Sequence, residues 1–286
     1  MRVLIGYNGT QIANDALGEL ERAGLPEDAE VNILCVSEDE PDNKSEAMLR
    51  LENAADRLAE RSRFRKINAE RLSGLPDQEI LNRAKSFVPD LIVLREEDPT
   101  SDEDEIRQQG LSQKILTEAG CSVRIARNKL GRNDASPPRI VIGYDGSAGG
   151  RLAVEAVLTR TWPANTEVRL VVVTDRAVLG SIGRFSPQMT NPQVEAKIAT
   201  QWANTLAEAP LRKLKDAGLD AVLWVEPGCP KEVLIDVAES WNADSIFLGP
   251  HCRNNLAQQV ALGSVSAGVA ANAHCSVEVV RTSTVI

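Results

Sequence analysis

Two stretches of this chain, Arg2-Val-Leu-Ile-Gly-Tyr-Asn8-Gly9-Thr10 and Arg139-Ile-Val-Ile-Gly-Tyr-Asp145-Gly146-Ser147, are nearly the same. Two further pairs follow in the same order, residues 74–81 with 228–235 and residues 119–126 with 273–280. A repeat of this length indicates two copies of one domain rather than a solenoid of short units. The sequence therefore predicts a first domain over 1–128, a polar, proline-ended linker over 129–138 and a second domain over 139–286.

Each copy alternates short apolar runs with helical patterns. Leu91–Leu94 and Leu170–Val173 are apolar without alternation, which is typical of strands covered on both faces. Strands that alternate with helices indicate βαβ crossovers and a parallel sheet. The predicted fold class is α/β, with two tandem doubly wound domains, each a five-stranded parallel sheet with helices on both faces. We expect strands at 2–7, 30–36, 68–72, 91–94, 122–126, 139–144, 167–174, 220–226, 244–248 and 276–281. We expect helices at 11–24, 45–65, 77–88, 111–119, 148–161, 193–217, 231–241 and 264–273.

Composition argues against several classes of function. The chain has a formal net charge of −9, of which −8 lies in residues 1–130, and only 3% aromatic residues. Nucleic-acid binding needs a basic field and stacking platforms, so no nucleic-acid partner is expected. No apolar run approaches the ~18 residues of a membrane span, so no membrane association is expected. Five cysteines without a C-x-x-C pattern indicate reduced thiols and a cytoplasmic protein.

Two other kinds of site are disfavoured by the residues present. His251-Cys252 and His274-Cys275 are His–Cys pairs, but neighbouring side chains in an extended chain point in opposite directions, so no metal site is expected. The two histidines have no Ser or Asp arrangement of a hydrolase triad. No general base is evident, and we do not expect an enzyme.

Ligands of open α/β sheets bind beyond the carboxyl ends of the strands, where the winding direction reverses. In the second copy, Asp145 follows the first strand directly, and Gly249 follows the fourth. Gly263-Ser264 opens a helix whose free N–H groups and positive end attract anions. We expect Ser264 to cap that helix or face a ligand, and the two glycines to let backbone approach a phosphate. Arg253 is either an added cation or a solvated surface charge.

These residues carry a family resemblance. Tyr-Asp-Gly-Ser after the first strand, Gly-x-Pro before a helix and the glycine-bounded loop 249–264 together resemble the universal stress protein family. The resemblance covers the whole chain and implies the strand order 3-2-1-4-5 and pairing of domains through the last strand, which here makes a pseudo-dimer within one chain. It also implies binding of ATP, or of AMP or ADP. The implied contacts are Asp145 with the ribose or adenine, the backbone of Val173 with the adenine, and Gly249, Arg253, Gly263, Ser264, Val265 and Ser266 around the phosphates.

The two copies depart from the family pattern to different degrees. In the second copy, Cys252 replaces a glycine and one extra residue precedes Gly263. In the first copy, Asn8 replaces the aspartate, and residues 96–105 hold seven acids in place of the glycine loop, which repel phosphate. We therefore expect an adenine nucleotide in the second domain only, with the loop 176–191 closing over the base.

Two alternatives to nucleotide binding remain open at this point. Cys252 and the extra residue favour a universal-stress-like scaffold that has lost nucleotide binding. A related adenylating enzyme would need catalytic residues that we cannot locate. An unknown protein partner, bound by the acidic first domain, and a homodimer are compatible with each alternative.

Overall fold

The computed structural model describes residues 1–7, 20, 22–37, 44–61, 64–95, 102–127, 136–174, 192–250 and 262–282. The first half contributes strands β1 (Arg2–Tyr7), β2 (Glu30–Ser37), β3 (Lys66–Ser73), β4 (Leu91–Arg95) and β5 (Ser122–Ala126), with helices α2 (Lys44–Arg61), α3 (Pro76–Phe87) and α4 (Asp102–Glu118). The second half contributes strands β6 (Arg139–Gly143), β7 (Glu167–Thr174), β8 (Asp220–Pro227), β9 (Ser245–Leu248) and β10 (Ser276–Val279), with helices α5 (Ala148–Leu158), α7 (Pro192–Asp216), α8 (Pro230–Ser240) and α9 (Ser264–Asn272).

Both halves have the predicted sheet. The strand order β3-β2-β1-β4-β5-β10-β9-β6-β7-β8 contains the order 3-2-1-4-5 twice, once in each direction. Within each half every pair of neighbouring strands is parallel. The expected α/β class and doubly wound topology are therefore confirmed. All ten expected strands are present, with ends that differ from the prediction by at most two residues.

Helix α4 differs most from its prediction. It begins at Asp102, nine residues before the expected start at 111, so residues 102–105 of the acidic run, which we expected outside any helix, are helical. Acidic residues at 102–105 suit the first turn of a helix, because the macrodipole places positive charge there. Residues 8–19 and 21, which cover most of the helix expected at 11–24, lie outside the described residues, as do residues 129–135 of the expected linker.

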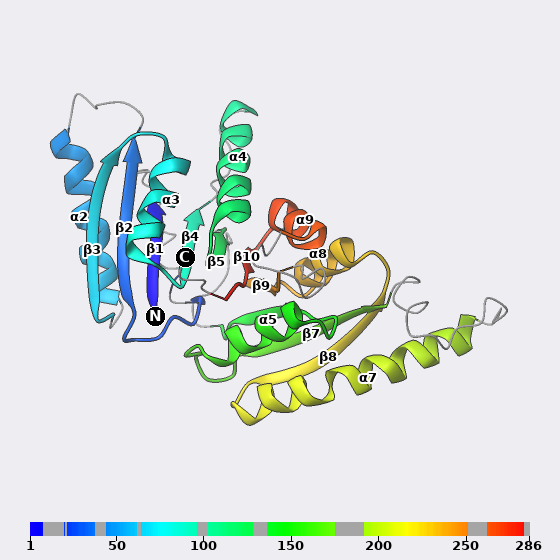
Figure 1. Ribbon diagram of the computed structural model, residues 1–286. Helices are drawn as coiled ribbons and strands as arrows, with labels where there is room; N and C mark the ends of the chain where they lie inside the picture. The colour runs from blue at the N-terminus through cyan, green and yellow to red at the C-terminus, as the bar shows by residue number, and fades with distance from the viewer. Residues whose placement is uncertain are drawn as a thin grey trace.

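The two sheets join through their last strands. β5 and β10 pair antiparallel, with Arg124 opposite Glu278 at the centre of the register. Figure 1 shows the result: the sheet runs from β3 on one side, through β5 and β10 in the middle, to β8 on the other side. The pseudo-dimer within one chain that the resemblance implied is therefore present.

The core differs between the two faces of the joined sheet. One hydrophobic cluster crosses the joint and contains side chains from α3, α4, α8 and α9 together with inward residues of both halves, such as Ile125 and Val277. The other face carries two separate clusters, one in the first half with α2 and one in the second half with α5 and α7. The halves thus share a core on one face and keep their own core on the other.

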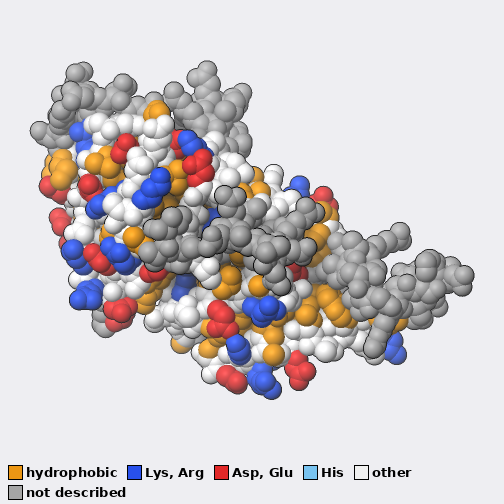
Figure 2. Space-filling model, viewed as in Figure 1, with side chains coloured by type: hydrophobic (Ala, Val, Ile, Leu, Met, Phe, Trp, Pro, Cys, Tyr) orange, Lys and Arg blue, Asp and Glu red, His pale blue; other side chains and the backbone are white. Residues whose placement is uncertain are grey.

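The described surface is mixed in charge. In the view of Figure 2, Lys and Arg side chains are interspersed with Asp and Glu among the described residues. Within the described part of the chain, no helix has the length and apolarity that a membrane crossing requires.

A turn of the first half packs tightly against the second half. Gly24 has a φ of +64°, and a Cβ added there would lie 2.7 Å from the indole ring of Trp162. The backbone N–H of Thr161 donates to the carbonyl of Gly24 at 3.0 Å. Glycine is needed here for its left-handed backbone and for the space that the indole occupies.

We predict that Gly24→Ala destabilises the protein more than Gly218→Ala. Gly218 has a similar positive φ of +85° but open space at its Cβ position, so alanine there costs only the backbone strain of about 1 to 2 kcal/mol. Alanine at Gly24 adds a clash with Trp162 that should cost about a further 1 to 3 kcal/mol. Urea denaturation of both variants measures the difference, and equal losses would show that the contact between the halves is not tight.

Candidate functional site

The candidate site lies at the carboxyl ends of β6 and β9. β6 pairs with β7 on one side and with β9 on the other, so the winding direction reverses between β6 and β9. The chain leaves β6 into the turn 144–147 and leaves β9 at Gly249. This is the position at which open α/β sheets bind their ligands.

Asp145 is exposed and held in a fixed turn. Its carboxylate accepts the backbone N–H of Ser147 at 2.9 Å, and the Ser147 hydroxyl in turn accepts the N–H of Gly150 at 3.0 Å as the N-cap of α5. Gly146 has a φ of +77°, and a Cβ there would lie 2.5 Å from Leu206 of α7. The turn therefore places an oriented carboxylate at the strand tip, where it can accept hydrogen bonds from a ligand hydroxyl.

Gly249 packs against the start of α5. A Cβ on Gly249 would lie 2.0 Å from the backbone of Gly149, and a Cβ on Gly149 would lie 2.3 Å from the carbonyl oxygen of Pro250. We expected Gly249 to make room for a phosphate, but its missing side chain makes room for Gly149. The contact ties the exits of β6 and β9 together.

Helix α9 begins where the sequence predicted, but its cap differs. Gly263 is the N-cap and makes no side-chain hydrogen bond, while Ser264 is the first helical residue. Of the two expected roles of Ser264, capping the helix is therefore wrong, because the cap needs the extended backbone that Gly263 adopts here. The other role, facing a ligand, stays a prediction. Ser264 is exposed, and buried Ser266 donates from its hydroxyl to the carbonyl of Gly249 at 3.0 Å, which anchors the helix start beside the β9 exit.

The same position in the first half has another structure. By the repeat offset of 154 residues, Ser264 corresponds to Gly110, which lies inside α4 rather than at its start. At 1.5 Å per residue, the eight residues from Asp102 to Gly110 move the helix start by about 12 Å. Figure 1 shows α4 extending well beyond α9. The N–H groups that are free at the start of α9 are interior to the helix at the matching place in α4.

Only some of the other predicted site residues lie among the residues that the structure describes. Val173 is half-buried near the end of β7, opposite Glu226 of β8. Val265 is half-buried in the first turn of α9 and packs on the shared core. Arg253, Cys252, Asn8, residues 96–101 and the loop 176–191 lie outside the described residues.

Sequence reasoning missed the roles of two residues at the start of α5. They are Ser147, the N-cap, and Gly149, which contacts the β9 exit. A signal for each was available, because serine is a preferred N-cap and two successive glycines are unfavourable in a helix unless close packing requires them.

The two cysteines that directly precede the last strands of the halves are buried. Burial raises the pKa of the Cys121 thiol to about 12, which makes a thiolate there unfavourable. Cys275, its counterpart, is also buried. The described residues contain no group of three or more His, Cys, Asp and Glu side chains arranged to hold a metal ion.

Comparison with known proteins identifies the family. The profile of the universal stress protein family matches residues 138–281. A universal stress protein from Archaeoglobus fulgidus DSM 4304 superposes with a TM-score of 0.61 at 18% identity, over 98% of this chain and 96% of that one. A functionally unknown protein from Pseudomonas aeruginosa PAO1 gives 0.62 at 16% identity, over 99% of this chain and 92% of that one. At these identities the two structures support the fold over the whole chain. A search of curated proteins gives no match.

We predict opposite effects of alanine at Gly249, which directly follows β9, and at Gly110, which lies inside α4. Gly249→Ala should destabilise by about 3 kcal/mol, because its Cβ meets backbone atoms of Gly149 that cannot rotate away. Gly110→Ala should stabilise by about 0.5 to 1 kcal/mol, because Gly110 is exposed within α4 and its added Cβ meets no atom within 4 Å. Urea midpoints of both variants test this, and an unchanged midpoint for Gly249→Ala would contradict the packing of α5 on the β9 exit.

Proposed function

We propose that this chain, which belongs to the universal stress protein family, binds an adenine nucleotide, ATP in the first instance, in its second half only. The observation that carries the proposal is the convergence of Asp145 and the start of α9 on the carboxyl edge at the β6–β9 switch point. Asp145 would accept hydrogen bonds from the ribose or adenine. The start of α9, with Gly263, Ser264, Val265 and Ser266, would hold the phosphates.

The restriction to the second half follows from the two helix starts. α9 presents its N-terminus at Ser264, whereas α4 is already one helix throughout the matching region and begins in an acidic segment. A phosphate approaching the first half would meet carboxylates where the second half offers N–H donors. Asn8 in place of Asp145 removes the charged acceptor as well.

The biochemical role would be that of a binding protein rather than of an efficient catalyst. Nucleotide would shift the population of a conformation that a protein partner reads, in a cytoplasmic stress response. Arg253 would add a cation beside the phosphates, and the backbone of Val173 would contact the adenine. The loop 176–191 would close over the base. Slow hydrolysis of ATP is compatible with this role.

Isothermal titration with ATP tests the proposal directly. We expect one nucleotide per chain, and Asp145→Asn should weaken binding about tenfold, the equivalent of about 1.4 kcal/mol, because a charged acceptor is stronger than a neutral one. The amide oxygen still accepts the Ser147 N–H, so the turn and the stability should survive. The matched control is Asn8→Asp, which should add no second site, since α4 has no helix start at Gly110. No heat from the wild type at millimolar ATP would end the proposal.

A second titration separates this proposal from a scaffold that has lost its ligand. Cys252 stands where the family resemblance expects glycine, and a side chain there would crowd the phosphates of a bound nucleotide. If the wild type binds ATP, we predict that the Cys252→Gly variant binds ATP more tightly. If ATP binds to the Cys252→Gly variant and not to the wild type, the scaffold function is correct and the nucleotide-binding function is wrong.

A further inference from the structure

The joint between the halves has a pseudo-twofold axis that passes between two equivalent residues. Arg124 and Glu278 are 154 residues apart, the same offset that relates Cys121 to Cys275, so they occupy the same position in the two copies. They are also direct partners in the antiparallel pair of β5 and β10. In a dimer of identical domains, this axis would place a residue against itself.

The contacts beside the axis are reciprocal. The Ser122 hydroxyl accepts the N–H of Arg281 at 3.0 Å and donates to its carbonyl at 3.2 Å. Ser276 does the same with Arg127, at 3.1 and 3.4 Å. Each arginine also donates from its guanidinium to a helix carbonyl of the opposite half, Leu116 for Arg281 and Ala270 for Arg127. Two identical copies of either half could make all of these contacts.

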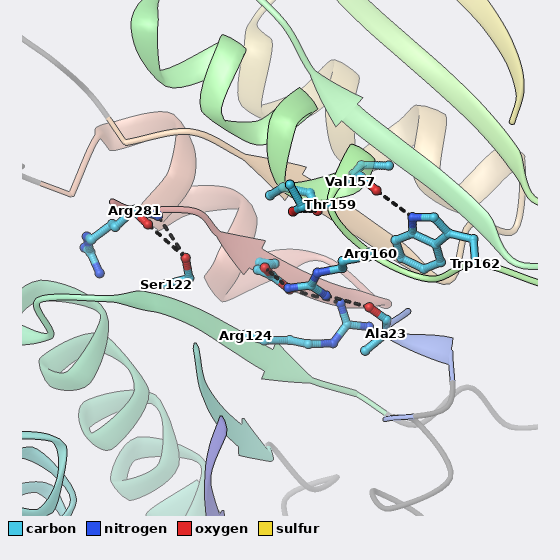
Figure 3. A network of polar contacts seen from close by, with 10 residues as sticks. Ala23, Ser122, Arg124, Val157, Thr159, Arg160, Trp162 and Arg281 are labelled. Carbon is cyan, nitrogen blue, oxygen red and sulfur yellow. Dashed lines mark hydrogen bonds and ion pairs between the residues drawn. The ribbon is translucent and has the colours of Figure 1, made fainter. Parts of the chain in front are cut away.

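The contacts on the axis are not reciprocal. The Arg124 guanidinium lies 3.6 Å from the Glu278 carboxylate, and both side chains are 1% exposed. Arg160 also pairs with Glu278 and donates to the carbonyl of Ala23 at 2.6 Å. Figure 3 shows Arg124 and Arg160 converging at the joint, with Ala23 beside them. By the offset of 137 residues, the counterpart of Arg160 in the first half is Ala23 itself, so the first half has no cation at the equivalent position.

Because these charges are buried, the stability of the joint depends on each charge keeping its partner. Burial lowers the pKa of Arg160, and the charge of Glu278 opposes that shift. A buried charge that loses its partner is strongly destabilising, and like charges on directly opposed strand residues repel. Pairing β5 with the β5 of a second copy would replace Glu278 by a second Arg124. Pairing β10 with the β10 of a second copy would still leave each Glu278 paired with its own Arg160. The charges therefore act mainly against pairing of β5 with a second β5.

We propose that Arg124 and Glu278 set the specificity of strand pairing at the joint. They favour pairing of a first half with a second half, and they disfavour pairing of a first half with the first half of another copy. The reciprocal contacts at Ser122 and Ser276 make the last strands able to pair at all. The charge pair on the axis decides which strands pair. This inference is independent of nucleotide binding.

Two full-length chains, each with one charge reversed, test this pairing specificity. Arg124→Glu places two acids on the axis, and Glu278→Arg places arginines on both strands. Each variant alone should lose hydrogen-exchange protection in β5 and β10. Mixed in equal amounts, with one variant isotope-labelled, they should form a mixed dimer of two 31.0 kDa chains, because exchanging halves creates one Arg124–Glu278 joint and one joint of reversed sign. Native mass spectrometry should show the mixed dimer in at least tenfold excess over dimers of either variant.

The matched control is a mixture of Ser122→Ala and Ser276→Ala, which weaken the joint at equivalent positions without changing charge, and which should form no mixed dimer. Absence of a mixed dimer between the charge variants, or equal amounts of all three dimers, would overturn the proposal. If the single variants fail to fold, the double variant Arg124→Glu with Glu278→Arg should recover soluble, folded protein. Failure of the double variant as well would also overturn it.

Discussion

The antiparallel pair of β5 and β10 is the interaction on which the rest of the structure depends. It turns two five-stranded sheets into one sheet, and it brings α3, α4, α8 and α9 onto a common face. The core on that face runs across the joint without a break, so neither half can bury its inner helices fully without the other. Loss of the joint would expose apolar residues of both halves at once, which is why its buried charges need to match.

The same pairing places the two candidate crevices at opposite edges of the sheet. Strands within each half are parallel, and the two halves meet antiparallel, so their carboxyl ends point in opposite directions. Each crevice must therefore draw its strand-tip residues from its own half. This separation allows α4 to begin early, in an acidic segment, while α9 begins at Ser264.

Most of the fold could be predicted because it depends on local patterns. Unbroken apolar runs such as Leu91–Leu94 mark strands covered on both faces, and the repeat marks the duplication. The start of α4 was missed because dense acids suit both a solvated loop and a helix N-terminus. The contact of Gly149 with Gly249 and the pairing of Arg124 with Glu278 depend on which strands become neighbours, which no local pattern encodes. For the candidate site, the sequence located Asp145 and the start of α9 but not the cap at Gly263.

Duplication within one chain removes a constraint that a homodimer cannot escape. On a twofold axis of identical subunits every residue must tolerate itself, so a buried arginine or glutamate there is unfavourable. Once the two copies are covalently joined, the axis position can differ between them, and here it holds Arg124 on one strand and Glu278 on the other. The same freedom acts at the strand tips, where Asn8 and Asp145 differ. A complementary axis also suits the divergence at the tips, because it pairs each first half, with Asn8 at its strand tip, with a second half that carries Asp145 there.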